Sequence, residues 1–214
     1  MGTIPLLAFG ALLVGCSIEA TKLPITYVPQ QNVQAIAGAD TVPVEVRVED
    51  LEPDEYDSFW DRANPFSDKL VRFQVKDAVD TVRGAAETEL KARGFKIGSG
   101  GALIVIQIER FAARKLIDGE FGFTATGRGY LSMRVEVQLQ TGKVLFSKNV
   151  GAEGTPTDES AFSGKPATHV LGESLTDALR GLFADPAFTA AILATRQQAP
   201  AKPSVQPVSP ALSP

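Results

Sequence analysis

Few residue types in this chain could carry out chemistry. Among 214 residues there is one cysteine, Cys16, and one histidine, His169. A single cysteine cannot form a disulfide within the chain, and one cysteine with one histidine cannot build a zinc site from those ligands. The net charge is −4 and the isoelectric point is about 5.1, which argues against a nucleic-acid partner because nucleic-acid-binding surfaces are basic. The chemistry to consider first is therefore a reaction of the Cys16 thiol.

Cys16 stands one residue after an apolar run. Residues 4–14 are almost wholly apolar, but the run is too short to span a bilayer, which takes about 20 residues as a helix. A short apolar run that ends in small residues is typical of a secretory signal. Its end, Leu13-Val14-Gly15-Cys16, resembles the lipobox of bacterial lipoproteins. In such proteins the thiol is alkylated by diacylglycerol, a peptidase cuts before the cysteine, and the new amine is usually acylated.

The lipobox resemblance implies a lipid anchor on Cys16, with Leu13, Val14 and Gly15 as the residues that the signal peptidase recognises. It implies no cofactor besides the covalent lipid. Two or three acyl chains would make membrane attachment long-lived. Ser17 follows the cysteine, which in enteric lipoproteins usually permits export to the outer membrane, although the inner membrane stays open as an alternative. No lysine or arginine precedes the apolar run, and the alternative interpretation is a buried N-terminal segment with an incidental cysteine.

Residues 49–66 begin with an acidic run. Four acids fall at positions 1, 3, 5 and 12 of a calcium-binding loop: Asp50, Glu52, Asp54 and Asp61. The sixth position, where the sharp turn of such a loop needs glycine, is Glu55. We therefore expect a solvated acidic loop and no metal site.

The same loop is unusually aromatic. Tyr56, Phe59 and Trp60 lie close together in the sequence, and aromatic side chains often anchor protein interfaces. These three residues are the candidates for binding a partner. The alternative is a lid that folds back over the core.

Paired carboxylates can perform acid–base hydrolysis when their surroundings separate their pKa values. Glu173 and Asp177 are four residues apart on the polar face of a predicted helix, where solvated acids are the norm. His169 stands at the start of that helix without an obvious partner, so a structural or solvent-exposed role is expected. We therefore expect no catalytic residues, no metal site and no enzymatic activity.

Hydrophobic periodicity predicts the elements of the first half of the chain. Alternating valines predict a strand over residues 42–48. Apolar residues at helical spacing predict a helix over residues 70–93 that ends at Gly94. Within it, Glu87 with Lys91 and Glu89 with Arg93 form i,i+4 pairs.

The second half begins with a central strand over residues 102–112, followed by a glycine-punctuated stretch that indicates turns. Strict alternation over residues 131–140, a turn at Thr141-Gly142 and a returning strand over residues 143–150 then predict a hairpin. A helix is expected over residues 168–183. Asp185-Pro186 is typical of the start of a last, short helix.

These elements predict an α+β fold with one domain. We expect an antiparallel or mixed sheet of about four strands, with a long helix and a C-terminal helix packed on it, in the order β-α-β-β-β-α-α. The expected divisions are a signal peptide, a lipidated cysteine with its tether, an α/β domain and a disordered tail rich in proline and alanine, at residues 1–15, 16–40, 41–198 and 199–214.

The mature chain resembles the YajG-like family of uncharacterised bacterial lipoproteins. Besides Cys16, the resemblance rests on Lys91-Ala92-Arg93-Gly94-Phe95, Val105-Ile106-Gln107-Ile108, Gly142-Lys143 and the helix around Leu175, Ala178 and Leu179. It covers most of residues 16–197; the acidic loop and the proline-rich tail depart from it. It implies an envelope lipoprotein that faces the periplasm from the outer membrane, and it assigns no catalytic residues.

The expected function is therefore that of a non-enzymatic envelope lipoprotein. The expected partners are the membrane, through the lipid on Cys16, and another envelope component, either a protein or peptidoglycan. One alternative is a regulator of a peptidoglycan synthase or of an envelope transport complex, which the tether would allow to reach across the periplasm. The other is a hydrolase that uses Glu173 and Asp177.

Overall fold

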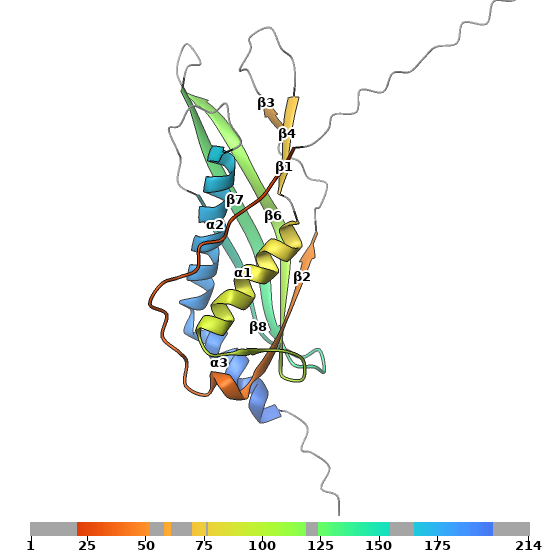
Figure 1. The fold of residues 1–214 in the computed structure, drawn as a ribbon. Coiled ribbons are helices and arrows are strands. Elements are labelled where there is room, and N and C mark those ends of the chain that lie inside the picture. Colours follow the sequence, from red (N-terminus) through yellow and green to blue (C-terminus); the bar gives the residue numbers. More distant parts are fainter. Residues whose placement is uncertain are drawn as a thin grey trace, which may run out of the picture.

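The computed structural model describes residues 21–51, 58–60, 70–75, 77–118, 124–154 and 165–198. Its main sheet has five strands in the order β5-β2-β6-β7-β8 (Figure 1). The strands are β2 (Pro43–Asp50), β5 (Lys96–Ile97), β6 (Ala102–Asp118), β7 (Thr124–Gln138) and β8 (Val144–Glu153). β2 is parallel to β5 and β6, whereas β6, β7 and β8 form an antiparallel meander. The predicted mixed sheet is confirmed, with β5 as a strand that the sequence did not predict.

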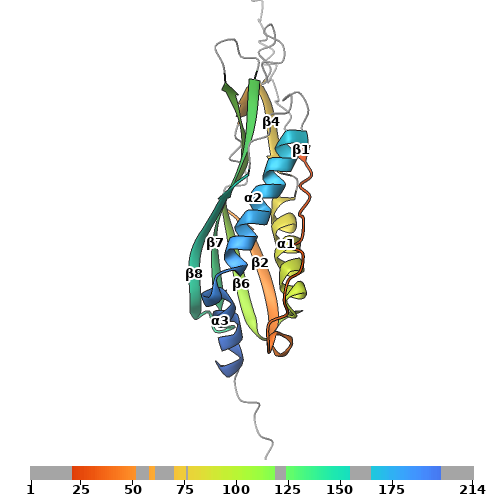
Figure 2. The same ribbon diagram turned by 90° about the vertical axis from the view of Figure 1, so that its left-hand side faces the viewer.

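The three α-helices of the described residues cover one face of this sheet (Figure 2). α1 (Ala78–Ala92) packs on β2, and α2 (Lys165–Phe183) crosses β7 and β8. α3 (Pro186–Ala194) follows after a single turn, with Asp185 as its N-cap, as predicted. The Asp185 carboxylate accepts a hydrogen bond of 2.9 Å from the backbone N–H of Ala187. The parallel pair β2 and β6 requires a crossover connection, and α1 lies within it.

The hydrophobic core lies between this helical layer and the sheet. Alternate residues of β2, β6 and β7 face the helices and are buried, as period-two strands require: Val44, Val46, Val48, Ile104, Ile106, Ile108, Met133, Val135 and Val137. They meet buried residues of the three helices: Val82, Ala86, Leu90, Leu175, Leu179, Leu182, Phe188 and Ile192. The alternation that the sequence showed in residues 42–48 and 131–137 therefore marks the core face.

A second, small sheet lies at one end of the molecule, and α3 lies at the other (Figure 1). Its strands are β1 (Thr21–Leu23), β3 (Ser58–Trp60) and β4 (Leu70–Val75), in the order β1-β4-β3. β1 runs parallel to β4 and β3 runs antiparallel to it. This sheet joins the beginning of the described chain to the aromatic segment around Trp60.

The predicted helix over residues 70–93 is wrong in its first part. Residues 70–75 form β4, and α1 begins only at Ala78, after Asp77 in a left-handed conformation with φ of 51°. Val71, Phe73 and Val75 also alternate with period two, so the local pattern fits both structures. Pairing with β1, which is distant in sequence, and with β3 selects the strand. The predicted end at Gly94, whose φ is 92°, is confirmed.

The glycine-punctuated stretch before the hairpin is also strand, because β6 extends to Asp118 and β7 begins at Thr124. Gly129 permits close packing and forms no turn. A Cβ atom built there would lie 2.4 Å from the backbone oxygen of Val170 in α2. The absence of a side chain therefore lets the helix backbone approach the sheet directly.

Of the predicted tether over residues 16–40, residues 16–20 lie outside the described residues, and residues 21–40 are part of the fold. Residues 24–36, called the strap here, lie against α1 and α2, and Tyr27 and Ile36 pack against the core (Figure 2). Ala39 is fully buried. The strap is neither helix nor strand, so it buries single residues and shows no periodicity in sequence. The folded domain therefore begins well before residue 41.

Replacing Gly129 with alanine is expected to lower the free energy of unfolding by about 1–3 kcal/mol, since a new Cβ would collide with α2 backbone that cannot easily move. Gly84 is the matched control. A Cβ atom there meets nothing within 4 Å, so Gly84→Ala should raise stability by about 0.5–1 kcal/mol through helix propensity. Urea unfolding measures both, and a Gly129→Ala domain as stable as the wild type would contradict the proposed close contact.

Candidate functional site

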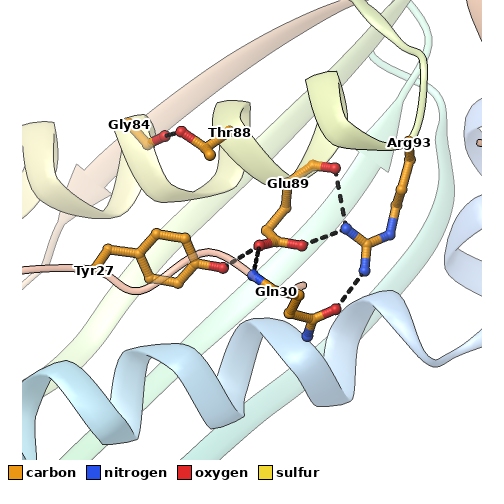
Figure 3. A network of polar contacts seen from close by, with 6 residues as sticks. All are labelled: Tyr27, Gln30, Gly84, Thr88, Glu89 and Arg93. Atoms are coloured by element: carbon orange, nitrogen blue, oxygen red, sulfur yellow. Dashed lines mark hydrogen bonds and ion pairs between the residues drawn. The ribbon is translucent and has the colours of Figure 1, made fainter. Parts of the chain in front are cut away.

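A network of polar contacts joins the strap to α1 (Figure 3). It consists of Tyr27, Gln30, Glu89 and Arg93, called the clasp here. The sequence predicted Glu89 and Arg93 as an i,i+4 pair, and the structure confirms the ion pair. Their side chains, however, are 0 % and 8 % exposed, respectively. The pair therefore lies in the interior, where a charge is tolerated only when it is paired and hydrogen-bonded.

Glu89 receives hydrogen bonds from three sides. The Tyr27 hydroxyl and the Gln30 backbone N–H, at 2.9 Å, both donate to Oε1. Nη1 of Arg93 donates to Oε2. Two of the three donors come from the strap, so the strap supplies much of what compensates the buried carboxylate for its lost water.

The Arg93 guanidinium also donates hydrogen bonds from both of its terminal nitrogens. Nη1 also donates to the backbone oxygen of Glu89 at 3.0 Å, and Nη2 donates to Oε1 of Gln30 at 2.7 Å. The guanidinium carbon lies 4.2 Å from the centroid of the Phe183 ring, a cation–π contact with the end of α2. The backbone oxygen of Arg93 accepts a hydrogen bond of 2.9 Å from Ile36. The clasp thus ties together α1, α2 and both ends of the strap.

The contacts of the clasp shift the pKa values of Glu89 and Tyr27. Burial by itself would raise the pKa of the Glu89 carboxyl, but hydrogen bonds from Tyr27, Gln30 and Arg93 outweigh it and hold the pKa below the ordinary value. Burial, together with the hydrogen bond to the Glu89 carboxylate, raises the pKa of the Tyr27 hydroxyl above its ordinary value. Glu89 is therefore ionised and Tyr27 is a neutral donor at neutral pH.

Two open grooves, each of about 580 Å³, flank the strap. The α3 groove lies between the second half of the strap and α3, and Arg93 and Phe183 also line it. The strap contributes a row of amide side chains to it: Gln30, Gln31, Asn32 and Gln34. The opposite wall is formed by α3, including Thr189 and Leu193. Amides donate and accept hydrogen bonds, so this groove suits an uncharged polar ligand.

The α2 groove lies between the first half of the strap and α2. It brings together the residues that the sequence analysis considered for a hydrolase. His169, Glu173 and Asp177 all line it, with Arg180. Nε2 of His169 lies 3.3 Å from Oε1 of Glu173, and Nη1 of Arg180 lies 2.5 Å from Oδ1 of Asp177. The two acidic side chains are 36 % and 44 % exposed. Each of these acids therefore lies beside a basic side chain of its own helix, on the polar face where the sequence placed it.

The structure reaches the other predicted site residues only in part. Phe59 and Trp60 belong to β3, so the aromatic segment is partly strand, while Tyr56 lies outside the described residues. Cys16 and the lipobox residues Leu13, Val14 and Gly15 also lie outside them.

The described residues contain no cluster of three or more histidine, cysteine, aspartate or glutamate side chains that could hold a metal ion. Asp50, the first acid of the calcium-like spacing, ends β2, and the other three acids lie outside the described part of the chain. None of the described helices is long and apolar enough to cross a membrane.

Comparison with known families gives the assignment. A family model described as "Uncharacterized lipoprotein" matches residues 29–193, most of the chain. The chain belongs to this lipoprotein family. The match begins inside the strap and ends in α3, so it includes the Gln30, Glu89 and Arg93 positions of the clasp.

Solved structures that resemble the chain include the following two. One is a protein from Xanthomonas campestris of the DUF330 family, with 11 % identity and a TM-score of 0.46, over 83 % of this chain and 98 % of that one. The other is a minor lipoprotein from Acinetobacter baumannii, with 7 % identity and a TM-score of 0.44, over 69 % and 94 % of the two chains. No curated protein matches the chain.

Replacing Glu89 with glutamine is expected to lower the free energy of unfolding by about 3 kcal/mol, because Arg93 stays buried without its counter-charge. Glu87→Gln is the matched control. Its carboxylate makes an exposed pair with Lys91 at 3.5 Å on the same helix, so the change should cost less than about 1 kcal/mol. Urea unfolding at neutral pH measures both variants, and equal effects would contradict the clasp.

The pH dependence gives an independent check of the same pair. A carboxyl whose pKa is lowered by folding stabilises the fold above its unfolded value, here 4.5, and this contribution is lost as the pH falls through the folded value. The difference in stability between the wild type and Glu89→Gln should therefore be constant near neutrality and narrow below pH 4.5. A difference that does not change with pH would show that Glu89 acts through packing alone.

Proposed function

We propose that the protein is a non-enzymatic envelope lipoprotein, anchored by a lipid on Cys16, that binds another envelope component from the periplasmic face of the outer membrane. The observation that carries this proposal is the position of the lipobox cysteine directly before a domain of a lipoprotein family. Cys16 precedes β1 by five positions and the strap by eight. The narrower YajG-like assignment is part of the same proposal.

The arrangement of the domain favours binding at the end remote from the anchor. β1 lies in the small sheet at one end of the molecule. α3 and its groove lie towards the opposite end of the molecule (Figures 1 and 2). A domain anchored near β1 would turn the α3 groove into the periplasm. The amide row of the strap can bond the backbone of a protein segment or the amide and hydroxyl groups of peptidoglycan.

The regulator alternative loses much of its support. It relied on a tether of residues 17–40, which would reach about 80 Å when extended. The strap occupies residues 24–36, and β1 begins at Thr21, so only residues 17–20 separate the cysteine from the described fold. That is about 15 Å of extended chain, too little to carry the domain across to a distant membrane.

Lipidation is tested by growing cells with a fatty-acid analogue. The wild-type chain should take up the label and sediment with membranes, whereas Cys16→Ala should lose the label and be released, because no other thiol exists in the chain. Ser17→Ala is the matched control and should keep the label. An unlabelled, soluble wild-type chain would overturn the proposed anchor.

Partner binding is tested with a photo-crosslinking amino acid placed at Gln34, an exposed residue of the α3 groove. Crosslinks formed in intact cells should join the chain to one defined envelope protein or to muramidase-sensitive material. Arg47 is the control position, since it is exposed on β2 but faces away from the helices. Equal crosslinking from both positions, or none from Gln34, would contradict the α3 groove as the binding site.

A further inference from the structure

The small sheet fixes where the proposed anchor lies relative to the fold. β1 pairs in parallel with β4, and Thr21 lies opposite Phe73. Cys16 precedes Thr21 by five positions. An extended chain covers at most about 3.6 Å per residue, so the cysteine lies within about 18 Å of Thr21.

The strand directions show which residues share that end. In β4 the chain runs from Leu70 towards Val75 and then into α1, and β1 runs the same way. The chain before Thr21 therefore joins the sheet from the side of Leu70. Trp60 lies opposite Leu70 in the antiparallel pair of β3 and β4, three positions beyond the level of Thr21. At about 3.3 Å per strand residue this is about 10 Å towards the anchor.

We propose that this end of the small sheet rests on the membrane surface, with Phe59 and Trp60 of β3 at the level of the lipid headgroups. The inference rests on the proposed lipid anchor and names the surface that the anchored domain turns towards the bilayer. Tryptophan and other aromatic residues favour the membrane–water interface, because one part of the ring system is apolar and, in tryptophan, another part donates a hydrogen bond. The occupant proposed for β3 is lipid, whereas the sequence analysis proposed a protein partner for Phe59 and Trp60.

The short link makes this contact effective. A surface held within about 18 Å of a bilayer meets it at a high effective concentration, so a contact too weak to recruit a free protein is populated in the anchored one. β3 is an edge strand of the small sheet, with β4 as its partner in that sheet. Membrane contact at this end agrees with the placement of α3 at the other end of the molecule (Figure 1).

The charges around β3 indicate what kind of contact it is. Asp57 and Asp61 flank the strand in sequence, while β1 and β4 carry Lys22 and Arg72. Charges of both signs give little net attraction to an anionic bilayer. The contact therefore depends on aromatic residues in the interface, and it should persist at high salt, unlike binding through a basic patch.

Trp60 is the only tryptophan in the chain, so the wild-type protein carries its own reporter. The experiment uses the lipidated full chain, purified from membranes and reconstituted into vesicles of phosphatidylethanolamine and phosphatidylglycerol with brominated acyl chains. Bromine near the headgroups should quench Trp60 emission about twofold, bromine near the bilayer centre should quench it less, and both effects should survive 0.5 M salt, a concentration at which the Debye length is only about 4 Å.

The matched control moves the reporter to the far end of the domain. Trp60→Phe combined with Ala187→Trp places the only tryptophan at an exposed position of α3, where brominated lipid should leave its emission unchanged. Equal quenching at both positions would overturn the proposal, because it would mean that the domain has no fixed orientation on the bilayer.

Flotation of the same samples separates this proposal from the anchor itself. A wild-type chain that floats with the vesicles while Trp60 is not quenched would overturn the membrane contact and leave the anchor intact. A wild-type chain that does not float would overturn both proposals. A chain that floats with Trp60 quenched and the tryptophan at position 187 unquenched supports both.

Discussion

The buried carboxylate of Glu89 is the constraint on which the arrangement of the helical layer depends. An ionised group without water must find donors, and one of them is Arg93, the C-cap residue of α1. The remaining donors are the Tyr27 hydroxyl and the Gln30 backbone N–H of the strap. The helix can therefore bury this side only with the strap in place, and the strap in turn forms one wall of each groove beside α2 and α3.

Local patterns predicted the elements whose residues repeat with one clear period. The β7–β8 hairpin and β2 follow from strict alternation, and α3 follows from the Asp185-Pro186 start signal. The helix predicted over residues 70–75 was wrong because Val71 and Val75 fit both the helical and the extended pattern. Pairing with β1 and β3 selects the strand β4. Gly129 looked like a turn residue because the approach of α2 cannot be read from its neighbours.

The candidate site was less predictable than the fold. The spacing of Glu89 and Arg93 gave the ion pair but not its burial, since the donors that make burial possible lie about 60 positions earlier in a segment without periodicity. The only early sign was the composition of the strap, where Gln30, Gln31, Asn32 and Gln34 stand close together. Amides of this kind are common in linkers, and their alignment along a groove appears only in three dimensions. His169, Glu173 and Asp177 were placed correctly on one helical face, because the helix period alone determines that relation.

The parallel pairing of β1 with β4 also determines how the domain would respond to mechanical load. A pull on the chain before Thr21 acts along the strand, so the hydrogen bonds between β1 and β4 are loaded together in shear and do not open one after another. Behind β1 the load passes along the strap to Tyr27 and Gln30, and through them to Glu89 and Arg93. Tension between the proposed lipid and a bound partner would therefore load the hydrogen bonds of the clasp. Release of the strap from the helices would require breaking the hydrogen bonds that Tyr27 and Gln30 donate to Glu89.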